Sequence, residues 1–276
     1  MDIALIAFDL DGTTLNSSKE ISPANRNALE KAYRRGKLLV PCTGRSLNHL
    51  SDALTALIND LGFDAFPYII TDNGAQAYCL PKRELILSHN IPEKTALELL
   101  AEGRSCDAQV YASFGHEGCT DNQGLAWETG TMPRMVNEYG EKWYFPIVDI
   151  EPLIKWNGGV LKLTVNFPDA ATAARRKWDF SRWPEVDTVS GADGNLEFVK
   201  AGISKAETLR FVAQRAGVPM GNIMAIGDHY NDIEMIEAAG FGVAMGNAIP
   251  VLKEKADWIS VTNDEDGLAL AIGKIL

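Results

Sequence analysis

Near the start of the chain stands the stretch Ile3-Ala4-Leu5-Ile6-Ala7-Phe8-Asp9-Leu10-Asp11-Gly12-Thr13. Its apolar residues 3–8 predict a buried parallel strand, because such strands are apolar on both faces. Asp9 and Asp11 then lie at the carboxyl end of the strand, where an open α/β sheet holds its chemistry. Gly12 lets the chain turn at once, so one acid can attack a substrate while the other handles protons. A simple turn is the alternative, since Asp and Gly often form turns after strands.

The composition excludes several classes of protein. The 276 residues, 46% of them hydrophobic, suffice for one large or two moderate domains with an ordinary core. The net charge of −11 argues against a nucleic-acid partner, because a phosphate backbone requires a basic surface. We expect a cytoplasmic protein without signal peptide or membrane span, because the chain lacks a basic N-terminal region and any apolar run of about 18 residues. The four scattered cysteines form no Cys-x-x-Cys pair, so reduced thiols are expected.

Alternating strand and helix patterns at both ends of the chain predict a parallel sheet. In the first part we expect a helix over 22–35, a strand over 38–42, a helix over 47–61 and a strand over 68–70, followed by Thr71-Asp72-Asn73-Gly74. In the last part we expect a helix over 204–216, a strand over 222–226, a helix over 232–239 and a strand over 242–245. Strands separated by helices in this way run parallel, with right-handed crossovers.

The middle of the chain, from about residue 81 to residue 190, has a different character. Its apolar stretches alternate as in half-exposed strands, and it contains Trp127, Trp143, Trp156, Trp178 and Trp183. We expect helices over 92–101 and 169–180, strands over 109–114, 160–167 and 186–189, and tryptophans buried in the module's own core. The expected domains are residues 1–82 and 191–276, forming the core, and residues 83–190, forming an inserted α+β module.

A second acidic motif, Gly227-Asp228-His229-Tyr230-Asn231-Asp232, follows the strand expected over 222–226 and precedes a helix. Helix capping would explain Asp232 alone and leave Asp228 unexplained. Together with Asp9 and Asp11, the motif brings four carboxylates to one crevice, and a divalent cation would relieve their repulsion. Hard oxygen ligands combined with a substrate phosphate suit Mg²⁺ rather than zinc.

Two further elements suggest anion binding. Thr43-Gly44-Arg45 follows the strand over 38–42, so that a hydroxyl and backbone N–H groups are aimed at an anion. Lys205 lies in the first turn of the helix over 204–216, where the helix dipole disfavours a cation. An anionic neighbour would explain this lysine, and a plain surface position is an equal alternative.

The four elements and their order resemble the haloacid dehalogenase-like (HAD) superfamily. The matching residues are Asp9-x-Asp11-Gly12-Thr13, Thr43-Gly44-Arg45, Lys205 and Gly227-Asp228-x-x-Asn231-Asp232. The place of the insertion resembles the large α/β cap, type C2B, of the Cof-type or subfamily IIB branch. Thr71-Asp72-Asn73-Gly74-Ala75 and Met245-Gly246-Asn247-Ala248 are also similar to that branch, whereas Thr14 and Ala206 stand where it usually has Leu and Gly. The resemblance implies an α/β fold: a Rossmann-like parallel-sheet core with an inserted α/β cap domain.

The resemblance also implies roles for individual residues. Asp9 would be the nucleophile that becomes an aspartyl phosphate, and Asp11 the general acid that protonates the leaving alcohol and later activates water. Mg²⁺ would bind Asp9, the backbone carbonyl of Asp11 and Asp228, with Asp232 supporting the metal shell. The residues implied in binding the phosphate or the substrate are Leu10, Thr43, Gly44, Arg45, Lys205 and Asn231.

The resemblance thus implies an Mg²⁺-dependent phosphatase that acts on phosphate monoesters of small metabolites, with sugar phosphates expected. Asp11 favours a phosphatase over a dehalogenase, because only an alcohol leaving group needs a second acid. A phosphomutase of the same superfamily and a non-catalytic, metal-binding regulatory protein are the alternatives. The expected partner is a small phosphorylated metabolite, without nucleic acid or membrane, and the expected state is a monomer or homodimer. Candidates for selecting the substrate are His116, Glu117, Arg134 and Lys162.

Overall fold

The computed structural model describes residues 2–106, 108–115, 118–121, 134–136, 142–144, 147–189 and 194–276. Unit 1 of its two compact units comprises Met1–Arg45, His49–Leu87 and Ser204–Leu276, and unit 2 comprises Ser46–Asn48 and Ser88–Ile203. The domain limits expected from sequence, 82/83 and 190/191, differ from these. Strand β5, Glu84–Ser88, continues a sheet of unit 1, and strand β15, Asn195–Lys200, pairs inside unit 2. Hydrogen bonding between strands, rather than composition, therefore decides where the units divide.

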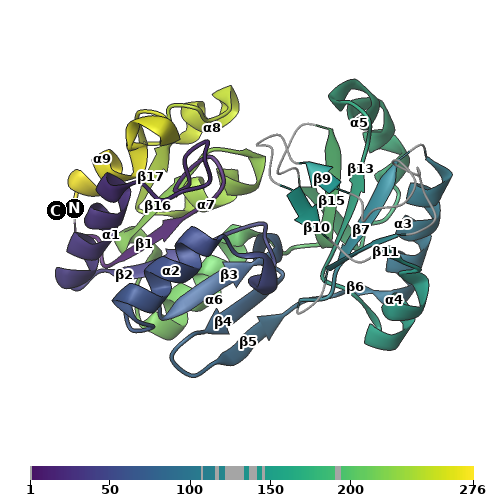
Figure 1. Ribbon diagram of the computed structural model, residues 1–276, viewed down its shortest axis with the longest axis horizontal. Coiled ribbons are helices and arrows are strands. Elements are labelled where there is room, and N and C mark those ends of the chain that lie inside the picture. Colours follow the sequence, from purple (N-terminus) through teal and green to yellow (C-terminus); the bar gives the residue numbers. More distant parts are fainter. Residues whose placement is uncertain are drawn as a thin grey trace. The chain divides into compact units, whose positions relative to one another are not determined.

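Unit 1 is built on a five-stranded parallel sheet with the strand order β18-β17-β16-β1-β2 (Figure 1). Its strands are β1 Leu5–Phe8, β2 Leu38–Pro41, β16 Ile223–Gly227, β17 Phe241–Ala244 and β18 Trp258–Ile259. Every residue of β1 is buried, as its apolar sequence predicts. The parallel α/β core is confirmed, and the strand order reverses between β1 and β16.

Strand β3, Tyr68–Thr71, runs parallel to β2 at a single bridge between Cys42 and Ile70. Its continuous partner is the antiparallel strand β4, Gln76–Cys79, and the two form a three-stranded sheet in the order β3-β4-β5. The sequence predicts the direction of β3 but not this antiparallel sheet. The chain reverses directly after β3 because Asp72, Asn73 and Gly74 have φ angles of +51°, +57° and +99°.

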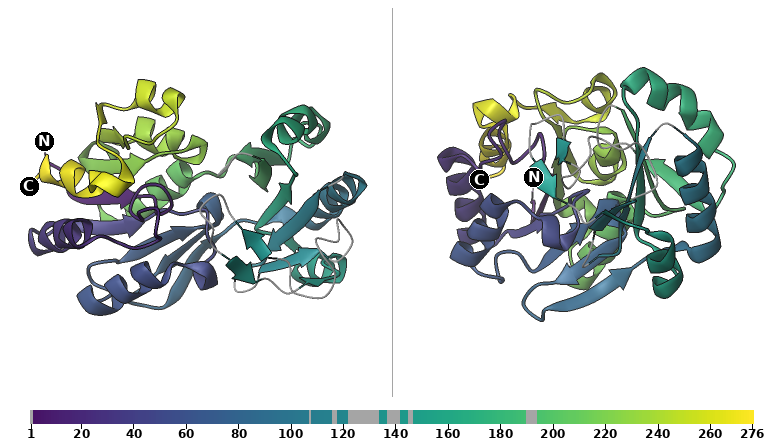
Figure 2. Two further views of the ribbon diagram at one scale, coloured as in Figure 1. Left: turned by 45° about the horizontal axis from the view of Figure 1, so that its top comes forward. Right: turned by 45° about the vertical axis from the view of Figure 1, so that its right-hand side comes forward.

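The helices of unit 1 are α1 Pro23–Arg34, α2 Asp52–Leu61, α6 Lys205–Ala216, α7 Ile233–Ala238, α8 Pro250–Lys255 and α9 Gly267–Gly273. Short 3₁₀ turns of unit 1 cover Asp72–Gly74, Met220–Asn222, Tyr230–Asp232 and Asn263–Glu265, and another covers Leu47–His49, of which only His49 belongs to unit 1. Ser22 and Ser204 cap α1 and α6, as expected. The helix expected over 47–61 begins only at Asp52, because the Ser51 side chain accepts the N–H of Leu54. Figures 1 and 2 show α1 (purple) and α9 (yellow) side by side.

Unit 2 is an α+β module, as expected. Its main sheet has the order β11-β8-β7-β13-β15-β14, and two smaller sheets pair β6 with β12 and β9 with β10. Its strands are β6 Ile91–Pro92, β7 Gln109–Ser113, β8 Gly118–Asp121, β9 Arg134–Val136, β10 Lys142–Tyr144, β11 Ile147–Val148, β12 Gly159–Val160, β13 Lys162–Asn166, β14 Val186–Val189 and β15. Its helices are α3 Glu93–Ser105, α4 Glu151–Asn157 and α5 Ala170–Arg176, with a 3₁₀ turn at Lys177–Phe180.

The tryptophans of unit 2 only partly follow the prediction of a shared core. Trp183 is buried, but Trp156 and Trp178 are 88% and 82% exposed, so the prediction is wrong for these two. Helix α4 packs through Ile154, which is fully buried, and a side chain two residues further along a helix points to a different face. Trp127 lies outside the described residues.

All four cysteines are buried and carry thiols, in agreement with the absence of a disulfide pattern. Among the described residues, no helix has the length and apolar character needed to cross a membrane.

Candidate active site

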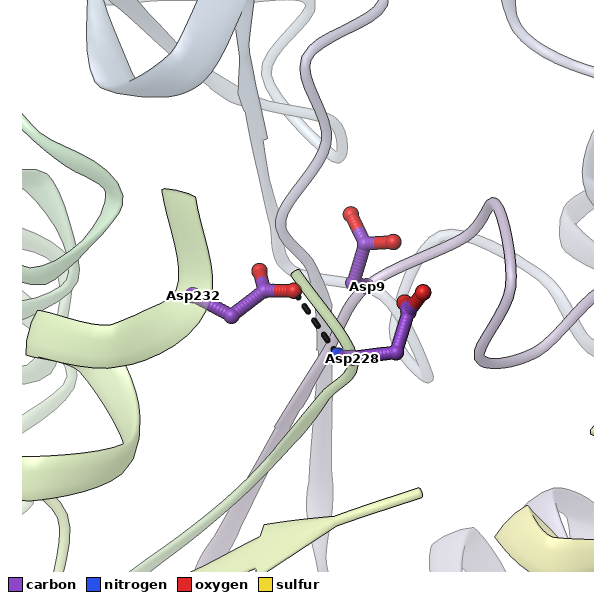
Figure 3. Close-up of side chains that lie close together, drawn as sticks. All are labelled: Asp9, Asp228 and Asp232. Atoms are coloured by element: carbon purple, nitrogen blue, oxygen red, sulfur yellow. Dashed lines mark hydrogen bonds between the residues drawn. The ribbon is translucent and has the colours of Figure 1, made fainter. Parts of the chain in front are cut away.

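Three carboxylates meet at the carboxyl ends of β1 and β16, where the strand order of the sheet reverses. Asp9 directly follows β1, Asp228 directly follows β16, and Asp232 ends the next 3₁₀ turn. One oxygen of each carboxylate lies within 4.8 Å of the others, and Figure 3 shows the three side chains converging. Such a reversal point is where open α/β sheets form binding crevices. The fold therefore joins the two acidic motifs, which are far apart in the sequence.

Lys205 connects two of these carboxylates. Its side chain is fully buried, and its Nζ donates hydrogen bonds to Asp9 Oδ1 at 2.6 Å and to Asp232 Oδ1 at 2.7 Å. Burial acts to lower the pKa of Lys205, but the charges of Asp232 and Asp9 outweigh it and raise the pKa above its ordinary value. Lys205 is therefore a permanent cation, and its two anionic neighbours explain its place in the first turn of α6.

Asp9 and Asp228 each present a carboxylate oxygen that receives no hydrogen bond from the residues that the structure describes. Within the described part of the chain, Lys205 binds Asp9 Oδ1 and Thr13 Oγ1 donates to Asp228 Oδ1 at 2.7 Å, while neither Oδ2 receives a hydrogen bond. Burial is the main cause that raises the pKa of Asp9 to about 7, with Lys205 opposing it. Burial and the charge of Asp9 also raise the pKa of Asp228 well above its usual range. Both shifts mean that ionising these buried carboxyl groups costs free energy.

Asp232 differs from the other two carboxylates because both of its oxygens are occupied. Oδ1 accepts from Lys205, and Oδ2 accepts the backbone N–H groups of Asp228 at 3.0 Å and His229 at 3.1 Å. Figure 3 marks the bond from the Asp228 backbone. Asp232 therefore fixes the loop that carries Asp228. A hard divalent cation fits this group of carboxylates. Asp9 and Asp228 are buried and offer oxygens as ligands, and Asp232 holds the backbone of the loop that carries Asp228.

Asp11 lies at the same end of β1 but has basic partners of its own. Arg45 donates from Nε to Asp11 Oδ2 and from Nη2 to Oδ1, both at 2.6 Å, and Lys19 Nζ reaches Oδ1 at 2.7 Å. Burial acts to raise the pKa of Asp11, but the hydrogen bonds and charges of Arg45 and Lys19 outweigh it and lower the pKa below its ordinary value. Arg45 was expected to bind the substrate. In the structure its guanidinium group donates hydrogen bonds to Asp11. Lys19 belongs to none of the four sequence motifs, so the sequence alone does not identify it as a residue of the site.

The loop after β2 is supported by a residue that the sequence analysis did not assign to the site. Thr43 is buried, and its Oγ1 accepts the N–H of Arg45 at 3.1 Å. A Cβ added to Gly44 would lie 2.8 Å from Asn73 Oδ1, so only glycine fits there without a shift. Asn73 Oδ1 also accepts from Asn231 Nδ2 at 2.9 Å. Asn73 therefore links the loop with the second acidic motif. The sequence feature that could have identified Asn73 is the predicted turn at residues 71–74.

The loop after β1 is held mainly by its own residues. Leu10 is fully buried, and its carbonyl accepts the N–H groups of Thr14 at 3.0 Å and Leu15 at 2.9 Å. Thr14 Oγ1 donates to the Asp9 carbonyl at 2.6 Å, and Asn247 Nδ2 donates to the Gly12 carbonyl at 2.8 Å. Leu10 thus shapes the backbone around the acids, and Thr14 uses a hydroxyl that the usual leucine lacks.

Replacing Gly12 by alanine is expected to lower metal affinity and activity by roughly 10- to 100-fold, as for other changes behind a metal ligand. Gly12 has φ +75°, and an added Cβ would collide with the Asp228 carboxylate. Gly36→Ala is the matched control, because Gly36 has φ +78° and nothing within 4 Å of the added Cβ. The two variants are compared by measuring activity at increasing concentrations of the metal ion. Equal effects of the two substitutions would show that backbone conformation alone matters.

The candidates for substrate selection belong to unit 2. His116 and Glu117 lie outside the described residues, and Arg134 lies in β9. Lys162 is buried, with its Nζ 3.3 Å from Glu197 Oε2 on the neighbouring strand β15. Lys162 therefore takes part in a buried ion pair of the main sheet.

Comparisons with known proteins agree with the geometry. A family model described as haloacid dehalogenase-like hydrolase matches residues 6–272. The 5-amino-6-(5-phospho-D-ribitylamino)uracil phosphatase YcsE of Bacillus subtilis (strain 168) is 33% identical over 276 aligned residues, which cover 99% of this chain and 95% of that protein. Both findings concern nearly the whole chain, including the inserted unit.

Solved structures give the same answer for the fold. A haloacid dehalogenase-like hydrolase from Bacteroides thetaiotaomicron is 30% identical with a TM-score of 0.81, covering 99% of this chain and 100% of that one. A HAD subclass IIB sugar phosphatase shares the fold, with a TM-score of 0.84 at 22% identity over 98% of both chains. The family expected from the four motifs is confirmed: this chain belongs to the haloacid dehalogenase-like hydrolases and is a phosphatase of that family.

Proposed function

We propose that the protein is an Mg²⁺-dependent phosphatase that hydrolyses phosphate monoesters of small metabolites, namely sugar or sugar-alcohol phosphates, through an aspartyl phosphate on Asp9. The arrangement of Asp9 carries the proposal: Lys205 holds one oxygen at 2.6 Å, and the other has no donor among the described residues. The name of the Bacillus subtilis relative, with its phosphorylated ribityl group, supports the substrate class. The net charge of −11 supports a small metabolite rather than a nucleic acid as partner.

In the first half of the reaction, a carboxylate oxygen of Asp9 forms a bond to phosphorus while the bond from phosphorus to the leaving oxygen breaks. The leaving oxygen takes a proton from the carboxyl group of Asp11 and departs as an alcohol. Lys205, whose Nζ lies 2.6 Å from Asp9 Oδ1, stabilises the negative charge of the transferred group. This step requires Asp11 in its protonated form. Its partners Arg45 and Lys19 lower its pKa and so favour the carboxylate form, which the second half of the reaction requires.

In the second half, water attacks phosphorus and gives a proton to the Asp11 carboxylate. The bond between phosphorus and Asp9 breaks, which releases inorganic phosphate and restores both side chains to their starting forms. Arg45 and Lys19 favour the carboxylate form of Asp11 that accepts this proton. The same carboxyl group therefore serves both halves.

Asp9 and Asp228 would hold the Mg²⁺ ion, together with the Asp11 backbone carbonyl, and Asp232 would orient the loop of Asp228. When bound, the ion neutralises part of the charge on the carboxylates and on the phosphoryl group. Thr43 and Gly44 line the loop after β2, where phosphoryl oxygens would meet backbone N–H groups. Asn231, held by Asn73, would contact the phosphoryl group or its surroundings.

A panel of phosphorylated metabolites assayed with and without Mg²⁺ tests this function. We expect phosphate release that EDTA abolishes and added Mg²⁺ restores, with the highest kcat/KM for sugar and sugar-alcohol phosphates. Asp228→Asn should raise the Mg²⁺ concentration needed for half-maximal activity by at least about tenfold, because one ligand loses its charge. Asp64→Asn is the matched control, since Asp64 is exposed.

Two results would contradict this assignment. Full phosphate release in EDTA would exclude the metal requirement. Transfer of the phosphoryl group to a second sugar, dependent on a bisphosphate activator and without net phosphate release, would show a mutase instead.

A further inference from the structure

We propose that Lys19 is a positioning residue for Asp11. Together with Arg45, it fixes the carboxylate so that Oδ2 carries the lone pair that exchanges protons with the leaving group and with water. The inference rests on the proposed role of Asp11 as acid and base. It adds a residue outside the four motifs and assigns the proton transfer to one oxygen atom.

The donors around Asp11 distinguish its two oxygens. A carboxylate oxygen accepts about two hydrogen bonds. Oδ1 receives Lys19 Nζ at 2.7 Å and Arg45 Nη2 at 2.6 Å, so both of its lone pairs are used. Oδ2 receives only Arg45 Nε, at 2.6 Å, among the donors that the structure describes. One lone pair of Oδ2 is therefore left for a substrate oxygen or a water molecule.

Exposure agrees with this division. The side chain of Asp11 is 26% exposed, whereas those of Lys19 and Arg45 are 11% and 6% exposed. The two cations are thus covered while part of the carboxylate stays accessible. Such charge-assisted bonds are short and directional, and the Arg45 guanidinium donates to both oxygens of the carboxylate.

Hydrogen bonds to Asn16 order the turn that carries Lys19 and hold the Lys19 side chain near Asp11. The Asn16 side chain accepts the N–H groups of Ser18 at 3.0 Å and Glu20 at 2.9 Å, and the Asn16 carbonyl accepts the N–H of Lys19 at 2.9 Å. Lys19 has φ +62°, a left-handed conformation that glycine and asparagine adopt more readily than lysine. The ammonium group, rather than the backbone, therefore accounts for a lysine at this position.

Loss of Lys19 would leave one lone pair of Oδ1 open. Either oxygen could then face the substrate, and the carboxylate could turn about the Arg45 fork. Proton transfer depends on geometry, since the acid must lie within hydrogen-bond reach of the atom that it protonates. The defect should therefore affect the steps that need a proton and spare those that do not.

Single-turnover kinetics with enzyme in excess test this, using p-nitrophenyl phosphate and phenyl phosphate with Mg²⁺. In Lys19→Asn, we expect the release of p-nitrophenol to change less than about twofold, because its anion leaves without a proton. The release of phenol should fall at least about tenfold, because phenolate is a poorer leaving group. Asparagine tolerates the left-handed backbone, and Lys19→Arg should restore phenol release by returning a cation.

Three controls separate this inference from the proposed function. Asp9→Asn should abolish both releases, Asp11→Asn should discriminate between the two esters, and Lys31→Gln, which removes an exposed lysine, should change neither. If Asp11→Asn discriminates but Lys19→Asn slows both esters equally or neither, the positioning role is wrong and the function stands. If Asp11→Asn itself does not discriminate, the acid role of Asp11 falls, and the inference about Lys19 falls with it.

Discussion

Replacing Lys205 by methionine is expected to lower kcat/KM for phosphate release by about 10³-fold, the size of effect seen when a charge-stabilising donor is removed from an active site. Lys205 Nζ lies 2.6 Å from Asp9 Oδ1 and 2.7 Å from Asp232 Oδ1. Methionine fills much of the same volume but carries no charge. The phosphoryl group and the two carboxylates would then lose the cation that they share.

The same substitution should destabilise the fold by about 3–5 kcal/mol, because removal of one partner leaves buried carboxylates unpaired. The sign of the pH dependence follows from Asp9. Its pKa is raised from 3.8 to about 7 even with Lys205 in place, and without the lysine it rises further. A carboxyl group whose pKa is higher in the folded than in the unfolded state makes the folded protein less stable as the pH rises from the unfolded-state pKa to the folded-state pKa. Below about pH 7 the Asp9 carboxyl group is largely neutral in both folded proteins, so the stability deficit of the variant relative to the wild type should grow as the pH rises above about 7.

Urea unfolding at pH 5 and pH 8, with EDTA present, measures the difference in stability. A separate assay of phosphate release measures the loss of activity. Lys31→Met is the control, because Lys31 is exposed on α1 and serves no carboxylate of the site. Wild-type stability and activity in Lys205→Met would show that Lys205 is not the cation of the site.

Replacing Asp9 by asparagine is expected to lower kcat by at least about 10⁴-fold, since removal of a nucleophile eliminates the covalent route. Asparagine keeps the shape of the side chain, and Lys205 keeps its 2.7 Å bond to Asp232. The protein should therefore still fold and still bind phosphorylated metabolites.

Stability should move in the opposite direction from activity in this variant. Burial raises the pKa of Asp9 to about 7, so ionisation of the carboxyl group opposes folding between about pH 4 and pH 7. A neutral amide avoids this cost. Thermal unfolding in EDTA at pH 7.5 should show a Tm equal to or above that of the wild type. A large drop in Tm together with lost activity would instead indicate a structural role.

Much of this fold is predictable from local sequence. The apolar run before Asp9 predicts β1, and the serines at positions 22 and 204 predict the starts of α1 and α6. The two acidic motifs come together because each follows a strand of one parallel sheet, and those strands are neighbours. Periodicity and caps are local signals, and parallel strands bring their carboxyl ends to one edge without further information.

Other features depend on contacts that no local pattern encodes. The antiparallel strand β4 follows from the left-handed backbone of Asp72 and Asn73. Lys19 reaches Asp11 because the Asn16 side chain orders a turn, and Arg45 turns to Asp11 because that carboxylate is within reach of its fork. Trp156 is exposed although tryptophan is usually buried, since its helix packs through Ile154. These outcomes were decided by tertiary packing.

The most direct test of the central claim is to trap the phosphoryl group on the enzyme during turnover. Wild-type protein is mixed with Mg²⁺ and its best substrate, quenched, reduced with borohydride and analysed by mass spectrometry of its peptides. Reduction converts an aspartyl phosphate to homoserine, and we expect this product at position 9 in the wild type and at no position in Asp9→Asn. An active wild-type enzyme that yields no homoserine at position 9, or yields it at another aspartate, would contradict the assignment of Asp9 as the nucleophile.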